Sequence, residues 1–426
     1  MKLPNLYPVR QTFPRPRVSS IDTAVREELD KLGVKHRLPK GAKVGVTAGS
    51  RGIGNIVEIL RTTVNYLKEH GFYPAIIAAM GSHGGGTADG QLKILHSLGI
   101  SEESLGVPIR VGVDVVEVGK TTKGLSAYIR KHVFDMDGVI VINRVKTHTA
   151  LDGNLQSGLI KACVVGLGGP KGAQQFHSLG TKELPGCLRE IGTLLVENGP
   201  IIGGLAIVEN GYDETAYIIG VEARRFIEEE PRIYETAAEL MPQLPIDRLD
   251  VLVVEEMGKN FSGSGIDNNV VGRFRVLGDP EPEKPFIKRV VILDLSIESH
   301  GNANGLGLAD FVTDKLLSQM DLKATYLNVL TSLFVQRCFI PLHFPSEKET
   351  IEMAIASLGH VIDDQLRLLI VSNTLHLEHL YASKALLPEL KVRPGVEIAD
   401  HCLAWEFDSN LEMIHKLSER VLSTTT

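Results

Sequence analysis

Residues 74–87 read PAIIAAMGSHGGGT, an uninterrupted apolar run followed directly by a glycine-rich turn that holds a histidine. A short, wholly apolar run of this kind is typical of a strand buried on both faces. Upstream, AKVGVTAGSRGIG at 42–54 has the same arrangement, and downstream GVIVINRVKTH at 138–148 repeats it with basic residues after the run. Helical patterns lie between these runs, at about 53–70 and 87–98. The alternation predicts a parallel sheet covered by helices on both faces.

The same pattern begins again after a proline-containing break, MPQLPID at 241–247. Its predicted strands are LDVLVVEEMG (249–258), VVILDLS (290–296), ATYLNVL (324–330) and LRLLIVSN (366–373), with helices from about Leu308 and at 346–358. We therefore predict two α/β domains with largely parallel sheets and an active-site cleft between them. The larger N-terminal domain, 1–246, would be the cofactor-binding and catalytic one, and the smaller domain, 247–408, would close the cleft. A last helix, within 409–426, is expected to pack back on the first domain.

Composition limits the class of protein. The chain has 426 residues, with 45 Lys and Arg against 52 Asp and Glu and a net charge of −7. This balance argues against a nucleic-acid-binding protein held by bulk positive charge. The four cysteines are too widely spaced for a disulfide framework. The N-terminus lacks the apolar core of a secretory signal, and no window reaches the roughly 18 apolar residues of a membrane span. We expect a soluble cytoplasmic protein with neither nucleic acid nor a membrane as partner.

Polar and basic side chains follow the predicted strands of the first domain. In open α/β sheets, ligands bind beyond the carboxyl ends of the strands, so the loops after these strands should converge. They contain Ser50 and Arg51, then His83, Gly84 and Gly85, and then Lys146 and His148. Such a set of cationic side chains and backbone N–H groups suits an anionic substrate or a phosphate.

A fourth segment, SGLIKACVVG at 157–166, contains a lysine among apolar residues. That environment lowers the pKa of a lysine and makes its amine nucleophilic. His177 follows Lys161 by sixteen residues. Taken alone, the lysine also fits a snorkelling side chain and each histidine a structural one. Three histidines and one lysine in loops of this kind together favour a functional site.

This set of residues resembles the nickel-dependent lactate racemase family, whose members use a nickel-pincer nucleotide. The resemblance covers most of the first domain and rests on ordered matches at similar intervals. The matching elements are Gly81 to Thr87 with His83 in third place, Gly119 to Gly124, His148, the S-G-x2-K-x4-G stretch of Ser157, Gly158, Lys161 and Gly166, and His177.

The resemblance implies a cofactor bound through lysine. Lys161 would carry the nickel-pincer nucleotide, a pyridinium mononucleotide with thioamide and thiocarboxylate sulfurs. His177 would complete the coordination of Ni(II), for which sulfur and imidazole are suitable donors. His83 and His148 would be the two general acid/bases. The other implied cofactor-binding positions are Ser50, Arg51, Gly84, Gly85, Ser157 and Gly158. Accessory proteins that synthesise the cofactor are implied partners.

The implied reaction is the racemisation or epimerisation of a small-molecule 2-hydroxy acid. A histidine would take the hydroxyl proton while the α-hydrogen moves as hydride to the nickel cofactor, and its return to the opposite face would invert the centre. Lys259, in the GKNF loop, resembles a family lysine that reaches the substrate; a solvated loop lysine is the alternative. Glu255 and Glu256 precede that loop, whereas lactate racemases carry a tyrosine and a tryptophan beside the substrate. We therefore expect a 2-hydroxy acid other than lactate, larger or polyhydroxylated.

Two other functions fit the same residues. His83, His148 and His177 are also a suitable set to hold Zn²⁺ directly and leave a position open for water, as in a metal-dependent hydrolase. The glycine-rich loops are consistent, too, with a non-catalytic protein that binds an anionic metabolite or nucleotide. Metal analysis of the purified protein would distinguish the three functions: nickel is expected for the racemase, zinc for the hydrolase and neither metal for the binding protein.

Overall fold

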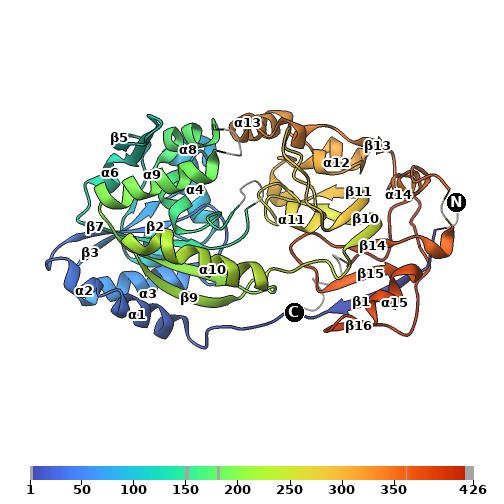
Figure 1. Ribbon diagram of the computed structural model, residues 1–426, viewed down its shortest axis with the longest axis horizontal. Helices are drawn as coiled ribbons and strands as arrows, with labels where there is room; N and C mark the ends of the chain where they lie inside the picture. The colour runs from blue at the N-terminus through green and yellow to red at the C-terminus, as the bar shows by residue number, and fades with distance from the viewer. Residues whose placement is uncertain (1–2, 149–152, 180–182, 361, 418–426) are drawn as a thin grey trace. The chain divides into compact units, whose positions relative to one another are not determined.

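The computed structural model describes residues 3–148, 153–179, 183–360 and 362–417. The chain forms two units, one of Pro14–Met241 and one of Met1–Phe13 together with Pro242–Thr426. Each unit is built on its own largely parallel sheet with helices against it (Figure 1). The α/β class predicted from the sequence is therefore confirmed.

The unit of Pro14–Met241 contains a six-stranded sheet in the order β4-β3-β2-β7-β8-β9. Its strands are β2 (Lys43–Ala48), β3 (Tyr73–Ala78), β4 (Ile109–Arg110), β7 (Gly138–Arg144), β8 (Ile201–Glu209) and β9 (Thr215–Glu222). All neighbours pair in parallel except β8 and β9, which pair antiparallel. A separate antiparallel pair is formed by β5 (Val115–Lys120) and β6 (Ser126–Arg130).

Helices cover both faces of this sheet, as its uninterrupted apolar strands require. They are α1 (Ile21–Lys31), α2 (Val34–Arg37), α3 (Ile56–Glu69), η1 (Gly84–Gly86), α4 (Ala88–Ser97), α5 (Glu102–Leu105), α6 (Lys131–Phe134), α7 (Leu159–Lys161), η2 (Ala162–Leu167), α8 (Gly169–His177), α9 (Leu184–Asn198), η3 (Ala223–Arg225) and α10 (Phe226–Leu240). One core joins α1 and α3 to the sheet, through residues such as Leu29 and Leu60. A second core, with Leu188 and Phe226, joins η2, α8, α9 and α10 to the opposite face.

The other unit contains an eight-stranded sheet in the order β13-β12-β11-β10-β14-β15-β1-β16. Its strands are β1 (Leu6–Gln11), β10 (Arg248–Met257), β11 (Phe286–Leu295), β12 (Phe311–Thr313), β13 (Leu342–Phe344), β14 (Leu368–Val371), β15 (His379–Ser383) and β16 (Val396–Ile398). Its helices are α11 (Asn268–Val271), η4 (Ile297–Ser299), η5 (Leu306–Leu308), α12 (Asp314–Ser318), α13 (Leu322–Ser332), η6 (Val335–Cys338), α14 (Glu347–Ala356), η7 (Asp363–Gln365), η8 (Lys384–Leu386) and α15 (Leu387–Leu390). The strands from β13 to β14 are parallel, and β15, β1 and β16 add an antiparallel edge.

Three segments differ from the sequence-based expectation. Residues 324–330, predicted as a strand, form most of helix α13. Residues 1–13 were placed with the first domain, whereas β1 pairs with β15 and β16 in the other unit. The predicted last helix falls partly outside the described residues, and positions 409–416 are not helical. Met413 and Leu417 of this segment pack in a core with α14 of the second unit.

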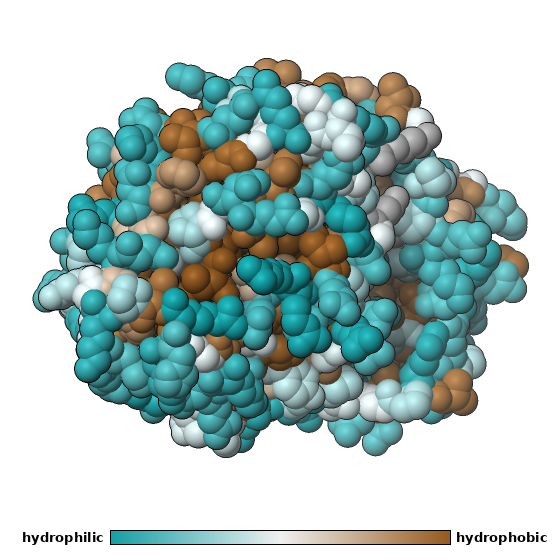
Figure 2. Space-filling view, turned by 60° about the vertical axis from the view of Figure 1, so that its left-hand side comes forward, coloured by the Kyte–Doolittle hydropathy of each residue, from teal (hydrophilic) through white to brown (hydrophobic). Residues whose placement is uncertain are grey.

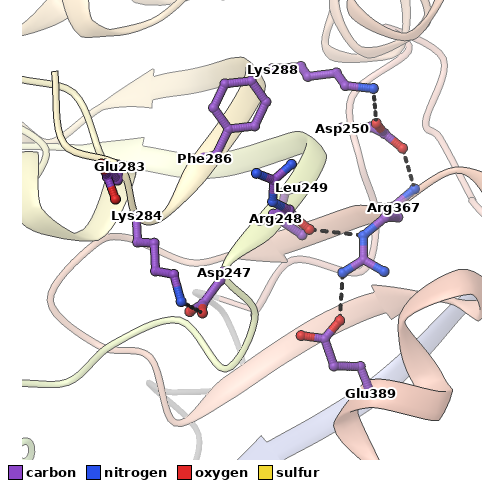
Figure 3. A pocket seen from close by; sticks show the side chains of 10 residues that line it. All are labelled: Asp247, Arg248, Leu249, Asp250, Glu283, Lys284, Phe286, Lys288, Arg367 and Glu389. Atoms are coloured by element: carbon purple, nitrogen blue, oxygen red, sulfur yellow. Dashed lines mark hydrogen bonds and ion pairs between the residues drawn. The ribbon is translucent and has the colours of Figure 1, made fainter.

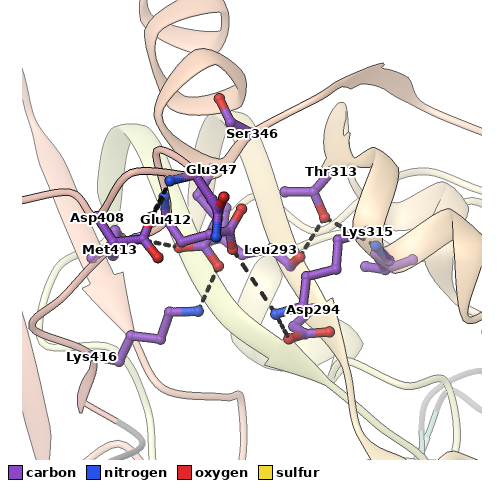
Figure 4. Close-up of polar contacts among 12 residues, drawn as sticks. Leu293, Asp294, Thr313, Lys315, Ser346, Glu347, Asp408, Glu412, Met413 and Lys416 are labelled. Carbon is purple, nitrogen blue, oxygen red and sulfur yellow. Dashed lines mark hydrogen bonds and ion pairs between the residues drawn. The ribbon is translucent and has the colours of Figure 1, made fainter.

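Hydrogen bonds and an ion pair fix the described part of the C-terminal segment to α14. The carboxylate of Glu347, fully buried at the start of α14, accepts the backbone N–H of Met413 at 2.8 Å and the ammonium of Lys416 at 2.5 Å (Figure 4). Glu255 at the end of β10 accepts the N–H of Leu417 at 2.8 Å. The segment is therefore integrated into this unit by buried charge as well as by apolar packing.

Hydrophilic residues dominate the surface that Figure 2 shows, with groups of hydrophobic residues between them. Within the described residues, no helix combines the length and the apolar character that crossing a membrane would need.

Candidate active site

The strand order of the unit of Pro14–Met241 places the ends of three neighbouring strands at one edge. The chain runs outward from β2 to β3 and β4 in one direction, and then from β7 to β8 in the other. A change of direction of this kind separates the loops after the two central strands, here β2 and β7, and leaves a crevice where ligands bind. In the parallel pairing Ala48 lies opposite Ala78, so β2 and β3 end level. The loops predicted to converge therefore begin side by side.

The loop that carries His83 is held at its base by two buried side chains. The guanidinium of Arg130, from β6, donates to the carbonyls of Ala78 and Met80 at 2.5 and 3.0 Å. The amide of Gln91, from α4, donates to the carbonyls of Met80 and Gly81 at 2.7 and 3.1 Å. These bonds satisfy the backbone of β3 where the strand stops, and they fix the point at which the loop leaves the sheet.

His83 itself is exposed and contacts the neighbouring loop. Its ring Nδ1 is hydrogen-bonded to the hydroxyl of Ser50, which follows β2. Gly84 and Gly85 form the tight turn η1 directly after the histidine, and Thr87 then begins α4 by accepting the N–H of Gly90 at 3.1 Å. The bond to Ser50 orients one ring nitrogen and leaves the imidazole accessible for proton transfer.

The segment that carries Lys161 is tied to the end of β7. A backbone bridge joins Lys146 and Ser157, with N···O distances of 2.9 and 3.3 Å. The carbonyl of Gly158 accepts the side-chain amide of Asn143 at 2.8 Å. Helix α7 follows, and from Lys161 the chain continues into the π-helical turn η2. Turns of this kind inside helices are frequent at functional sites, because the wider backbone re-aims the side chains around it.

A buried glutamate supports the turn that presents Lys161. The carboxylate of Glu230, from α10, accepts the N–H of Ile160 at 3.0 Å and is only 1% exposed. A Cβ at Gly158 would lie 2.5 Å from its carboxyl carbon, so only glycine leaves room for this contact. Burial raises the pKa of Glu230 to about 7, against the backbone hydrogen bonds of Ile160 and Leu159, which lower it.

Close backbone packing joins the histidine loop to the lysine segment. A Cβ at Gly81 would lie 2.6 Å from the Cβ of Ala173 in α8, and one at Gly166 in η2 would lie 2.9 Å from the carbonyl oxygen of Ala79. Only glycine permits both approaches. The loop after β3 and the continuous segment η2–α8, which runs from just after Lys161 to His177, are therefore in direct contact.

Positive charge accumulates around Lys161. Desolvation by the surrounding protein, and then the charges of Arg51 and Lys146, lower the pKa of its amine to about 7. The pKa of Arg51 is also lowered, by desolvation and by the charge of Arg144, although the residue is exposed to solvent. Near neutral pH a large fraction of Lys161 is thus the uncharged, nucleophilic amine. A negatively charged ligand would be attracted by the cations around it.

His177, at the end of α8, lies close enough to Lys161 to sense its charge. Desolvation, and then that charge, lower the pKa of His177 to about 4. The ring is therefore neutral near pH 7, which is the form that binds metal ions. A neutral amine, a neutral imidazole and nearby cations fit the requirements of a covalently attached, anionic nucleotide whose metal takes one protein ligand.

The end of β8 contributes a carboxylate to the same edge of the sheet. Glu209 forms an ion pair with Arg144 and accepts the N–H of Gly54 at 2.5 Å. It therefore joins the loop after β2 to the end of β7, on the two sides of the point at which the chain changes direction. Its side chain is almost buried, so the pair is shielded from solvent.

The two other predicted catalytic residues have hydrogen bonds of their own. His148 stands two residues after Lys146, partly exposed, and its N–H donates to Gln156 at 2.6 Å. Lys259 belongs to the other unit, where its ammonium donates to the carbonyls of Gly263 and Asn304 at 2.7 and 3.3 Å. These bonds hold the ammonium of Lys259 against its own unit.

Sequence reasoning missed Arg130, Glu209 and Glu230. Glu209 ends the strand LAIVEN, so the rule that polar residues after strands gather at one edge would have found it. Arg130 and Glu230 had no such signal. Each acts across a tertiary contact from an element remote in sequence.

Within the described residues, no group of three or more His, Cys, Asp or Glu side chains lies in an arrangement able to hold a metal ion. His83, His148 and His177 thus do not form a zinc site in this structure. A metal held by the cofactor and by the single ligand His177 would not require a group of three such side chains.

A hollow of about 850 Å³ in the other unit contains none of the predicted site residues. It lies at the amino ends of β10 and β11, and three ion pairs join six of its charged side chains (Figure 3). The pairs are Lys284 with Asp247 at 2.9 Å, Lys288 with Asp250 at 2.8 Å and Arg367 with Glu389 at 2.7 Å. Most charged side chains of this hollow are therefore already bound to a neighbour of opposite charge.

Comparison with known proteins supports the family suggested by the sequence. Residues 18–185 match the family model of the lactate racemase N-terminal domain. All the predicted site residues except Lys259 fall within that segment. The fold is similar to that of the lactate racemase apoprotein from Thermoanaerobacterium thermosaccharolyticum, with a TM-score of 0.51, 12% identity, and coverage of 87% of this chain and 99% of that one. No curated protein matches the chain by sequence.

Proposed function

We propose that this chain, which carries an N-terminal domain of the lactate racemase family, is a racemase or epimerase of a 2-hydroxy acid and uses a nickel-pincer nucleotide linked to Lys161. The family match and the fold support the class of reaction. The observation that supports the cofactor most strongly is a lysine with a pKa lowered to about 7 beside a histidine with a pKa lowered to about 4.

Lys161 would bind the cofactor through its uncharged amine, and the neutral ring of His177 would hold its nickel. Arg51 and Lys146 would attract the anionic phosphate or the substrate carboxylate. When bound, the cofactor supplies a reversible acceptor for the hydrogen on the substrate's α-carbon. Glu230 would keep the turn of Lys161 in place through the N–H of Ile160.

A histidine would remove the proton of the substrate hydroxyl. His83 is accessible and oriented by Ser50, as a general base requires. His148 would serve the opposite enantiomer. Lys259 is a weaker candidate for substrate contact, since its ammonium already binds two carbonyls. The carboxylate of Glu255 accepts the N–H of Leu417 in the C-terminal segment. The expectation of a substrate larger than lactate, which was based on Glu255 and Glu256, therefore rests on the sequence alone.

The test is a chiral assay on protein produced together with the cofactor-synthesis proteins. A panel of single-enantiomer 2-hydroxy acids is incubated with the wild type and with His83→Ala. The wild type should invert at least one acid, and His83→Ala should do so about 10²–10⁴-fold more slowly, the usual loss for a missing general base. If protein with bound nickel and nucleotide inverts none, the proposal fails.

A further inference from the structure

Helix α13 (labelled in Figure 1) exposes its large apolar side chains to solvent, whereas Thr325 and Asn328 face the protein together with the smaller Val329. Thr325 is buried and accepts the N–H of Ala303 at 3.1 Å. The side-chain oxygen of Asn328 accepts the amide of Asn304 at 3.0 Å. On the outer side Leu330 is 65% exposed. This arrangement departs from the usual pattern, in which a surface helix buries its largest apolar side chains.

The exposed apolar side chains continue beyond the helix. Nine large ones lie between residues 322 and 342, and each is 48–65% exposed. They are Leu322, Tyr326, Leu327, Leu330, Leu333, Val335, Phe339, Ile340 and Leu342, which we call the α13 patch. The last of them is in β13, the outermost strand in the sheet order at that end.

The area of the α13 patch is sufficient for a stable association. With about 180 Å² for a fully exposed large apolar side chain, nine side chains exposed by 48–65% together present roughly 900 Å². A standard interface buries about 800 Å² on each partner, whereas exposed apolar patches on monomers rarely exceed a few hundred Å².

The charge of the patch favours a partner of the same kind. Lys323 and Arg337 are the only charged residues from 322 to 342. The guanidinium of Arg337 is buried and donates to the carbonyl of Phe274 at 2.9 Å, so it adds no charge to the surface. Two copies of this surface would meet with little repulsion. Leu322, Tyr326, Leu330 and Leu333 follow one another at intervals of three or four residues, so they form a single stripe along the helix.

We propose that this chain forms a twofold-symmetric homodimer through the α13 patch. In an isologous contact the same surface serves both subunits, so a continuous, nearly neutral apolar stripe is self-complementary. Depletion of charge and a high apolar fraction are also what homodimer interfaces show at their centre.

The test is the mass in solution of the full chain, by light scattering after gel filtration and by sedimentation over a range of concentrations. The wild type should be a dimer. The double variant L327E/L330E should raise the dimer dissociation constant at least about 100-fold, because association would bury carboxylates in an apolar contact. Both side chains are more than half exposed, so thermal unfolding should change by no more than a few degrees.

Val392→Glu is the matched control, because this residue is 78% exposed and lies near β16, at the opposite end of the sheet. It should remain dimeric. A wild type that stays monomeric at every concentration would overturn the proposal, whether the patch is covered within the chain or by another protein. A folded double variant that dimerises as the wild type does would overturn it too.

Discussion

Glu230→Gln should remove a pH dependence of stability that the wild type shows between about pH 5 and pH 7. Burial raises the pKa of Glu230 to about 7, whereas in the unfolded chain it is near 4.5. Between these values the folded state holds the extra proton, so the free energy of unfolding falls as the pH rises and levels off above the folded pKa. A shift of about 2.5 units corresponds to roughly 3 kcal/mol at 1.36 kcal/mol per unit.

Glutamine cannot ionise, yet its carbonyl oxygen can still accept the N–H of Ile160. The measurement is urea denaturation followed by circular dichroism from about pH 5 to pH 8. If the amide lowers the free energy of unfolding by an amount that does not depend on pH, the whole pH profile of the variant shifts and its slope stays the same. Glu228→Gln, two residues earlier in α10 and exposed, should keep the wild-type slope. If the profiles of Glu230→Gln and wild type run parallel, the carboxyl does not titrate as argued.

Three further predictions follow from buried or desolvated charge. Arg130→Met should lower the free energy of unfolding by about 3 kcal/mol, since two backbone carbonyls lose a charged donor, and urea denaturation should show this. Lys416→Met removes the cation that pairs with the buried carboxylate of Glu347, so the fluorescence of Trp405 should report a free energy of unfolding lower by about 3 kcal/mol; an unchanged midpoint would contradict this. Lys161 should react with an amine-acylating reagent half-maximally near pH 7, as peptide mapping would show, and a midpoint near that of free lysine would refute its lowered pKa.

The sequence predicted the strands best where burial leaves no ambiguity. The apolar runs at 42–48, 74–79 and 138–143 lie in or largely overlap β2, β3 and β7, because central strands of a parallel sheet are apolar on both faces. ATYLNVL at 324–330 was wrongly predicted as a strand. Its leucines and tyrosine face solvent, whereas Thr325 faces the protein together with Val329, so apolar character does not identify the buried positions there.

Local sequence identified the residues of the candidate site that lie in loops after strands or among apolar residues. Ser50, His83 and Lys161 were selected because each follows a strand or lies among apolar residues, and the sheet order brings their loops to one edge. The supporting contacts were not predictable. Arg130 and Glu230 act on backbone groups 50–70 positions away, and such pairs are visible only once the fold is known.

The most direct test of the account is the intact mass of the protein after production with the cofactor-synthesis proteins. Wild type and Lys171→Ala, which alters an exposed lysine of α8, should both gain the mass of one nucleotide-derived group. Lys161→Ala should gain none, and His177→Ala should keep the organic adduct but lose nickel. A normal adduct on Lys161→Ala, or no adduct on the wild type, would contradict the central claim.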